Sequence, residues 1–330
     1  PPQAASAPRQ QALARPARWI MLLAAALCIA ILAALVVGRD PTGAWTVSTG
    51  AALQDLLPWR WPRVLASVAA GGMLAMAGVI LQRYTGNPMA SPEVLGVSSG
   101  AGLGLVASLF LAAALGDALQ TLCAAGGAGL TMGVLLWLSR TAHRNPTQFL
   151  LIGVALTAFL ATLFAVLMAS GDPRMLQLLP WMSGSTHGVL PAEAVLALIL
   201  AVCFLLIAPL TGRWLEILPL GSEAARALGV DLRLSRLCLL VLATLMTAAA
   251  TLLVGPLTFV GLMAPHLARQ VGFVRPRPQL LASALLAALM MLAADWLGRT
   301  IDFPWQFPAG LIATLLASPF LLWLLSRRPA

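Results

Sequence analysis

The sequence contains no lysine and few charges of any kind. Only 9% of its 330 residues are charged, whereas 60% are hydrophobic, and the mean hydropathy is +0.91. About a quarter of the residues in a soluble globular domain are charged, so this chain has too few charges to cover a surface that faces water. The composition therefore excludes an ordinary soluble domain and predicts a membrane protein.

The sequence also lacks the patterns of a nucleic-acid-binding protein, a metalloprotein or an enzyme. The net charge is +9, but the arginines stand singly or in pairs, without the basic stripe that nucleic acids require. The four cysteines have no paired spacing, and His143, His187 and His266 are far apart, so we expect no disulfide and no metal site. No Walker, HExxH or GxSxG motif occurs, and we expect no catalytic residue.

Long apolar runs fill most of the chain, and a helix of about 20 residues crosses a bilayer core. The run at 237–268 is too long for one crossing, and Gly255-Pro256 divides it. We therefore expect an all-α polytopic membrane protein, with a cytoplasmic tail or linker at residues 1–18 and a ten-helix transmembrane domain at residues 19–330. The predicted spans are 19–38, 64–82, 94–115, 118–139, 149–169, 194–212, 237–254, 256–269, 278–294 and 303–326.

The arginines are distributed unequally between the two sides of this predicted domain. Ten crossings place both termini on one side, and fifteen arginines fall on that side. The other five are Arg39, Arg60, Arg63, Arg174 and Arg299. Because positive residues are enriched in cytoplasmic loops, both termini are predicted to be cytoplasmic.

Residues 83–104, RYTGNPMASPEVLGVSSGAGLG, include five glycines and could be taken for a phosphate-binding loop. Such a loop needs a preceding strand, and none is expected here. Ser91 instead suits the N-cap of the third helix. Gly96, Gly100 and Gly104 then recur every four residues along one helical face, the small-residue spacing that lets membrane helices pack closely.

On the predicted cytoplasmic side, GSEAARALG at residues 221–229 is typical of a short helix between two glycines. Ser222 suits its N-cap, Glu223 its first turn, and Gly229 the left-handed position after its end. Two interpretations are open. The helix either only closes a loop, or it is a docking element through which a cytoplasmic partner transmits force.

On the outer side, RWPR places Arg60 and Arg63 just before the second predicted helix. They either anchor that helix at the interface together with the neighbouring tryptophans, or form a positive patch that receives acidic residues of an extracytoplasmic partner. Asp295 and Arg299 have i,i+4 spacing at the outer end of the ninth helix, which predicts an ion pair between them.

Four longer stretches carry a resemblance to a known family. They are RWPRVLASVAAGGMLAMAGVILQRYTGNPMASPEVLGVSSGAGLG, LPLGSEAARALGV, GPLTFVGLMAPHLARQVG and FPAGLIATLLASPFLLWLL. In this order they resemble the iron-chelate and vitamin B12 permease family of ABC importers, over about residues 45–326. Residues 84–96, 169–186 and 303–311 are most similar to the C-terminal half of the ferric-hydroxamate members, in which two ten-helix halves are fused in one chain.

The resemblance implies a type II ABC importer permease fold in the bacterial inner membrane. The implied function is that of a non-enzymatic subunit that moves a ferric siderophore of the hydroxamate type from periplasm to cytoplasm. The implied partners are a second permease half, a periplasmic binding protein and two cytoplasmic ATPase subunits, which hold ATP and Mg²⁺ while this chain binds no cofactor.

Two alternatives to a siderophore permease are open. Haem or cobalamin is the alternative cargo within the family, because no motif marks the residues that line the pathway. An ion-coupled secondary transporter is the alternative outside it, and it would place ionisable groups near the middle of the bilayer. Here the acidic residues lie in loops or at helix ends, which argues against it.

The resemblance also implies three functional sites. Binding-protein docking would use Arg60, Arg63 and Arg299. ATPase coupling would use Gly221, Ser222, Glu223, Ala224, Arg226 and Gly229. The inner gate would fall at Asn87, Pro88 and Met89. Separately, the soft side chains Met73, Met76, Trp181 and Met182 either give the pathway an adaptable surface or only pack in the interior.

Overall fold

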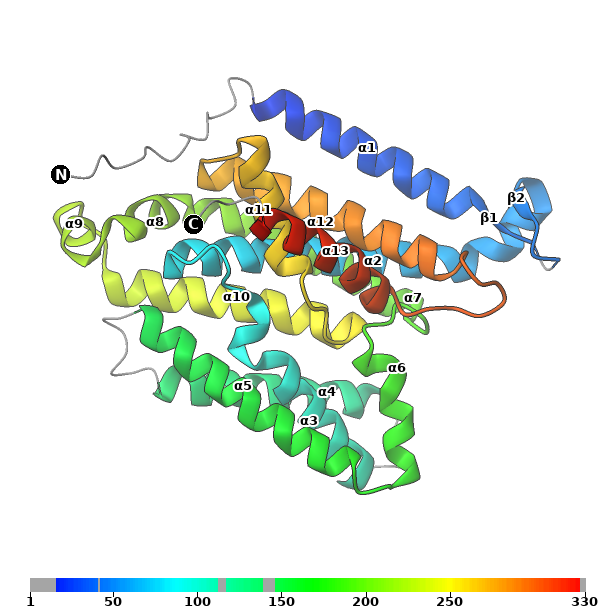
Figure 1. The fold of residues 1–330 in the computed structure, drawn as a ribbon, viewed down its shortest axis with the longest axis horizontal. Coiled ribbons are helices and arrows are strands. Elements are labelled where there is room, and N and C mark those ends of the chain that lie inside the picture. Colours follow the sequence, from blue (N-terminus) through cyan, green and yellow to red (C-terminus); the bar gives the residue numbers. More distant parts are fainter. Residues whose placement is uncertain (1–15, 41, 112–116, 139–145, 327–330) are drawn as a thin grey trace.

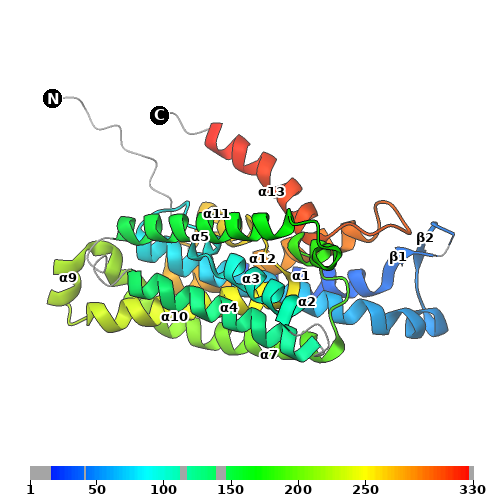
Figure 2. The ribbon, with the colours of Figure 1, turned by 90° about the horizontal axis from the view of Figure 1, so that it is seen from below.

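The computed structural model describes residues 16–40, 42–111, 117–138 and 146–326. Within them the chain forms a bundle of helices (Figures 1 and 2). Each of the ten predicted spans corresponds to one helix of the bundle. These helices are α1 (Pro16–Val36), α2 (Gly50–Thr85), α3 (Val97–Leu111), α4 (Asp117–Leu138), α5 (Pro146–Met168), α7 (Pro191–Ile207), α10 (Leu232–Val254), α11 (Val260–Val271), α12 (Pro276–Gly298) and α13 (Ala309–Ser326).

The helices differ in whether they can cross a bilayer alone. Seven helical segments of the described part are long and apolar enough to do so, and α3 and α13 are shorter apolar helices. Helix α11 has 12 residues, which is about 18 Å at 1.5 Å per residue, against roughly 30 Å of hydrocarbon core. The predicted all-helical, multi-span architecture is therefore confirmed, although not every helix is a full crossing.

Short elements connect the long helices. A two-stranded antiparallel hairpin, which the all-α expectation did not include, pairs β1 (Val37–Arg39) with β2 (Trp45–Val47) after α1. The other short elements are η1 (Pro92–Leu95), η3 (Pro173–Leu178), α6 (Leu179–Met182), η4 (Ala208–Thr211), α8 (Gly212–Ile217), η5 (Leu218–Leu220) and α9 (Ser222–Ala227). The hairpin lies at one end of the bundle and α9 at the other (Figure 1); these are the hairpin end and the α9 end below.

Helix α2 begins well before its predicted start at residue 64. It runs from Gly50 through both of its prolines, and its 36 residues span about 54 Å. The guanidinium of Arg60 donates to the carbonyl oxygen of Leu35 at 2.7 Å, which holds this turn against the end of α1. Arg60 and Arg63 therefore lie on the helix and not in a loop before it.

Helix α2 is also the centre of the bundle. In its most apolar window 89% of the residues are buried, against 11% in α1 and in α5. Small residues bring it close to two neighbours. A Cβ on Gly71 would lie 2.6 Å from the carbonyl oxygen of Ala287 in α12, and a Cβ on Gly78 would overlap that of Gly261 in α11. Helix α2 therefore meets α12 and α11 backbone to backbone.

Two helices begin later than the sequence predicted. Helix α11 starts at Val260 instead of Pro256, because Phe259 has a φ of 68°, which a right-handed helix does not tolerate. Helix α13 starts at Ala309 instead of residue 303, and residues 299–308 form a loop at the hairpin end. At the other terminus, residues 16–18 of the predicted tail belong to α1, and residues 1–15 lie outside the described part.

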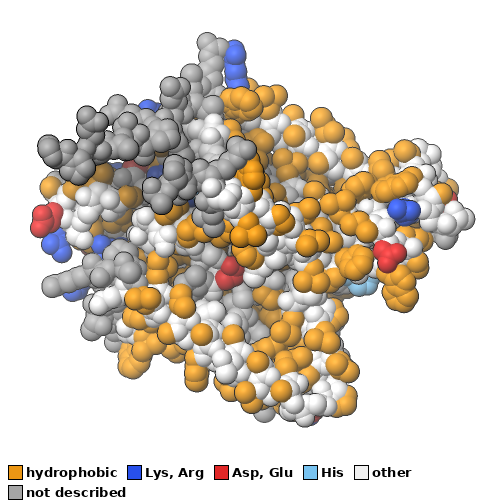
Figure 3. All heavy atoms as spheres, viewed as in Figure 1, with side chains coloured by type: hydrophobic (Ala, Val, Ile, Leu, Met, Phe, Trp, Pro, Cys, Tyr) orange, Lys and Arg blue, Asp and Glu red, His pale blue; other side chains and the backbone are white. Residues whose placement is uncertain are grey.

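The surface between the two ends is mostly hydrophobic, as Figure 3 shows for one face. Ile29, Leu130 and Leu206 come from three different helices, and their exposed fractions are 68%, 70% and 68%. A soluble monomer does not expose apolar surface on this scale. The arrangement is that of a protein surrounded by lipid, with its charged side chains mainly at the two ends.

Candidate functional site

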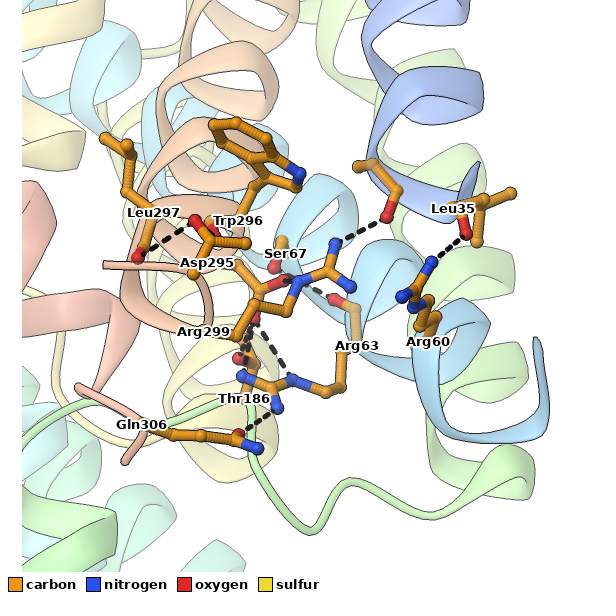
Figure 4. A network of polar contacts seen from close by, with 12 residues as sticks. Leu35, Arg60, Arg63, Ser67, Thr186, Asp295, Trp296, Leu297, Arg299 and Gln306 are labelled. Carbon is orange, nitrogen blue, oxygen red and sulfur yellow. Dashed lines mark hydrogen bonds and ion pairs between the residues drawn. The ribbon is translucent and has the colours of Figure 1, made fainter. Parts of the chain in front are cut away.

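Arg63 and Arg299 meet at Asp295 at the hairpin end of the bundle (Figure 4). Arg63 Nη2 lies 3.0 Å from Oδ1 of the carboxylate, and Arg299 Nε lies 3.3 Å from Oδ2. The ion pair between Asp295 and Arg299 is thus confirmed, while Arg63 reaches the same carboxylate from α2. The Asp295 side chain has no exposed surface, and those of Arg63 and Arg299 are 11% and 9% exposed. A carboxylate buried this deeply persists only with such partners.

Two loops are bound into the same cluster. Thr186, in the loop before α7, donates its hydroxyl to Asp295 at 2.5 Å, and Gln306, in the loop before α13, accepts from Arg63 at 2.5 Å. These partners are 109 and 243 positions apart in the sequence, so no local spacing could have indicated them. The cluster joins α2, α12 and both loops at the hairpin end.

Arg60 stands apart from this cluster. It is 8% exposed, and its guanidinium donates to the carbonyl oxygens of Leu35 and Val36 at 2.7 and 3.3 Å. Arg299 makes a similar bond to the carbonyl oxygen of Ala34 at 2.7 Å. The three predicted docking arginines therefore gather at one end of the bundle, but each has a partner within the chain and they do not form an open positive patch.

The predicted inner-gate residues form an exposed turn where α2 ends. The side-chain oxygen of Asn87 accepts from the backbone N–H of Met89 at 2.9 Å. A bond from an asparagine to the backbone two residues ahead is an Asx-turn. Asn87, Pro88 and Met89 are all exposed, so the turn presents its side chains at the α9 end of the bundle.

The third helix begins later than predicted. Ser91 caps η1 instead, where its hydroxyl accepts from the Glu93 N–H at 3.4 Å. Gly96 then ends η1 with a φ of 72°, a left-handed conformation that interrupts a helix. Helix α3 therefore starts at Val97.

Only two of the three glycines in the predicted stripe lie on α3. A Cβ on Gly100 would lie 2.7 Å from the carbonyl oxygen of Gly127, and a Cβ on Gly104 would also clash with the α4 backbone. These two glycines let α3 and α4 pack closely, as small residues do in membrane helices. Gly96 lies before the helix and faces the side chains of Thr157 in α5 and Thr131 in α4.

The carboxyl group of Glu93 is only partly satisfied. Its Oε2 atom accepts a hydrogen bond from Ser91 Oγ, whereas Oε1 is buried with no hydrogen-bond partner among the described residues. The hydroxyl of Thr157 lies 3.4 Å from the Glu93 carbonyl oxygen, which places η1 beside the middle of α5. The sequence predicted Glu93 as a first-turn residue of the third helix and did not assign its carboxyl group to a functional site.

The predicted coupling segment contains α9, with a different cap from the one expected. Gly221 occupies the N-cap position, and Ser222 is the first helical residue. The hydroxyl of Ser222 accepts from Arg236 of α10 at 3.2 Å. The serine therefore ties α9 to the next long helix instead of capping its own.

The other end of α9 is as predicted. Gly229 has a φ of 73°, and its N–H bonds to the carbonyl oxygen of Arg226 at 2.9 Å. The next N–H, of Val230, bonds to that of Ala225 at 3.0 Å, which completes a Schellman motif. Ala225 is buried, while Glu223 and Arg226 are exposed, so α9 has one anchored residue and an otherwise open surface.

An apolar cavity of about 400 Å³ lies between α3, α5 and α6. Its lining includes Ser98, Phe164, Met168, Trp181 and Met182. Trp181 and Met182 thus face a cavity, whereas Met73 and Met76 are buried in α2 and serve packing. The lining is mostly apolar, includes serine hydroxyl groups and contains no charged side chain. Such a cavity suits a bulky ligand that is bound by many weak contacts.

The two histidines of the described part lie in different environments. His187 is exposed, while His266 is buried in α11 with its Nε2 3.3 Å from the amide of Gln270. His143 lies outside the described residues. Within the described part, no three His, Cys, Asp or Glu side chains come together as a metal site would require.

Comparison with known proteins gives close matches along most of the chain. The profile of the FecCD transport family matches residues 20–327. The iron(3+)-hydroxamate import system permease proteins of Escherichia coli K12 and Salmonella typhimurium are 49% and 48% identical to it over 92% of this chain. The matched regions cover 46% and 44% of those two proteins, so the chain spans about half of their length.

More distant relatives match over most of both chains. The hemin transport system permease protein of Yersinia pestis is 36% identical over 86% of this chain and 87% of its own. A solved metal-chelate type ABC transporter in an inward-facing conformation superimposes with a TM-score of 0.84. That structure is 22% identical and covers 95% of this chain and 100% of its own, which shows a shared fold.

Proposed function

This chain belongs to the FecCD transport family, and on that premise we propose that it is a membrane permease of an ATP-driven importer for ferric hydroxamates. The observation that carries the proposal is the 49% identity to a hydroxamate permease over 92% of the chain. The proposed direction of transport is from periplasm to cytoplasm. Family membership favours this function over an ion-coupled secondary transporter.

The uncharged cavity is consistent with such a cargo. Iron in a hydroxamate chelate arrives with its coordination sphere filled, so the pathway needs no metal ligands of its own. A lining of aromatic, thioether and hydroxyl groups makes many weak contacts. Weak contacts suit transport because the cargo has to leave the site again.

A second permease half is proposed to complete the pathway, since the chain spans about half of the length of the hydroxamate relatives. Helices α5 and α13 lie on the same side of the molecule (Figure 2). Their exposed apolar side chains include Leu151, Phe159, Leu315 and Leu322, with exposed fractions of 64–69%. This side supports contact with a second half across the cavity that α5 lines.

The α9 end is proposed to face the cytoplasm, because described arginines of the larger predicted group, among them Arg213, Arg226 and Arg277, lie at that end. The open surface of α9 would receive one of two ATPase subunits, which supply ATP and Mg²⁺. The inner gate is proposed at the exposed turn of Asn87, Pro88 and Met89. The hairpin end would then receive the periplasmic binding protein, with Arg60, Arg63 and Arg299 as the proposed docking residues.

Transport of labelled cargo tests the proposal. The complete transporter, with its second half and its ATPase subunits, is reconstituted in proteoliposomes. The binding protein is placed on the side of the membrane that the hairpin end faces. We expect ATP-dependent accumulation of radiolabelled ferric hydroxamate and little of haem or cobalamin. Accumulation that persists with a hydrolysis-deficient ATPase would overturn the ABC mechanism, whereas accumulation of haem or cobalamin alone would reassign the cargo within the family.

A further inference from the structure

A second cavity, of about 550 Å³, lies at the α9 end of the bundle. It is bounded by the first turns of α1 and α12 and by the short helix α8. The side chains that matter are Arg213 and Glu216 on α8, Arg275 and Arg277 at the start of α12, and Ile20 and Leu281. Neither the transport pathway nor the predicted functional sites account for this cavity.

The three arginines of this cavity are short of partners. All three are exposed, and within the described part none has a carboxylate within ion-pair distance. Arg213 makes one bond, at 3.3 Å, to the carbonyl oxygen of Leu228. The chain outside the described residues contains no Asp or Glu, so Glu216 is the only acidic side chain on the lining. The site therefore carries an excess of positive charge.

The shape of the site matches a charged group on an apolar stem. Guanidinium groups present forked donors that fit phosphate oxygens, and Ile20 and Leu281 add apolar surface to the same cavity. Along α1, the neighbouring side chains of Met21 and Leu22 are 64% and 61% exposed. The cavity is therefore continuous with a helix surface that lipid covers.

The position of the cavity along the membrane normal also suits a charged group on an apolar stem. Its lining comes from the first turns of two long apolar helices, and the ends of such helices lie at the level of the lipid headgroups. Basic pockets between membrane helices on the cytoplasmic side bind anionic headgroups. Free phosphate would use the arginines but would leave the apolar part of the cavity empty.

We propose that this cavity binds the phosphate headgroup of an anionic phospholipid, such as phosphatidylglycerol or cardiolipin, with an acyl chain along Ile20 and Leu281. The inference rests on the proposed cytoplasmic orientation of the α9 end and does not depend on the cargo. It ties the ends of α1, α8 and α12 together through a lipid. In the absence of that lipid, the positive charges of Arg213, Arg275 and Arg277 repel one another.

Native mass spectrometry of the complete transporter tests the site. The probe is phosphatidylglycerol, added in competition with phosphatidylcholine to the delipidated complex. We expect the unchanged protein to retain phosphatidylglycerol preferentially. The double variant Arg275→Gln and Arg277→Gln should retain about 30-fold less, because each basic residue near an anionic headgroup contributes roughly fivefold.

Three controls make the result specific. Arg233→Gln removes an exposed arginine at the same end of the bundle but outside the cavity, and should leave retention unchanged. Arg275→Lys with Arg277→Lys keeps the charge and should restore most of the retention. Thermal unfolding of each variant in detergent shows whether loss of lipid reflects loss of the fold.

Several outcomes would overturn the proposal. Equal retention of phosphatidylcholine, or an equal loss in Arg233→Gln, would show that no specific anionic site exists. Displacement of the lipid by millimolar inorganic phosphate would assign the cavity to a soluble anion. Loss of ATPase-subunit association in the double variant, with lipid retention unchanged, would assign the surface to a protein partner.

Discussion

Arg63 and Asp295, 232 positions apart in the chain, form an ion pair of 3.0 Å at the hairpin end of the bundle. The carboxylate also faces Arg299 and accepts a hydrogen bond from Thr186. Because Asp295 is fully buried, its single negative charge is shared by two mostly buried arginines, and the three side chains together keep one positive charge. Several consequences of this arrangement, and of the close helix contacts, can be measured.

Asp295→Asn should destabilise the protein strongly. The substitution leaves Arg63 and Arg299 without their common counterion, and removing one partner of a buried pair costs about 3–5 kcal/mol. The apparent melting temperature of the purified protein in detergent should fall clearly. Asp302→Asn, which removes an exposed carboxylate from the nearby loop, should leave it unchanged. Equal melting temperatures for both variants would show that the cluster contributes little to stability.

Arg63→Gln tests docking of the binding protein. If Arg63 receives an acidic residue of that partner, its loss should weaken association about tenfold at low salt, with a smaller effect at high salt. The measurement is the dissociation constant at two salt concentrations, together with the melting temperature. Arg174→Gln is the control, because Arg174 is a half-buried arginine at the same end with its own partner, Asp172. Unchanged affinity with a lowered melting temperature would leave Arg63 a structural residue only.

Gly78→Ala should destabilise the contact between α2 and α11. A methyl group at Gly78 would overlap the carbonyl oxygen of Gly261, and overpacking of an interior costs about 1–3 kcal/mol. Gly72→Ala is a matched control on the same helix, because its added Cβ would lie 3.9 Å from the nearest atoms. Thermal unfolding should separate the two variants. A similar melting temperature for both would mean that the two backbones can move apart at no cost.

Gly229→Val should uncouple ATP hydrolysis from transport. The left-handed conformation at this position costs a branched residue roughly 1–2 kcal/mol, which loosens the Schellman motif that ends α9. We expect lower stimulation of ATP hydrolysis by the loaded binding protein, with basal hydrolysis unchanged. Gly43→Val provides the control, because Gly43 has a φ of 85° in an open position at the opposite end. Full stimulation in Gly229→Val would argue against a coupling role for α9.

The sequence predicted the features that depend on local composition and spacing. Long apolar runs identified each helix of the bundle, and the i,i+4 spacing of Asp295 and Arg299 predicted their ion pair. The glycine at position 229 indicated a left-handed residue, and it is one. Each of these follows from a few neighbouring residues, which is why the sequence alone was sufficient.

The sequence could not predict the features that depend on tertiary contacts. Arg60 and Arg63 were expected before the second helix, because the uncharged run begins at residue 64, yet α2 already includes them, and they bond to the end of α1 and to Asp295. Helix α3 starts at Val97 and not at the predicted residue 94, because Gly96 takes a left-handed conformation beside α5. The partners of Asp295 other than Arg299 come from distant parts of the chain, so no local pattern marks them.

The contact of Gly78 with Gly261 has a consequence for how the protein changes shape. No layer of side chains separates α2 from α11 there, so neither helix can rotate or slide without driving one backbone into the other. We expect these two helices to move as one rigid body between the outward-open and inward-open states. The conformational change would then fall to helices outside this pair, such as α5, which is 11% buried in its most apolar window against 89% in α2.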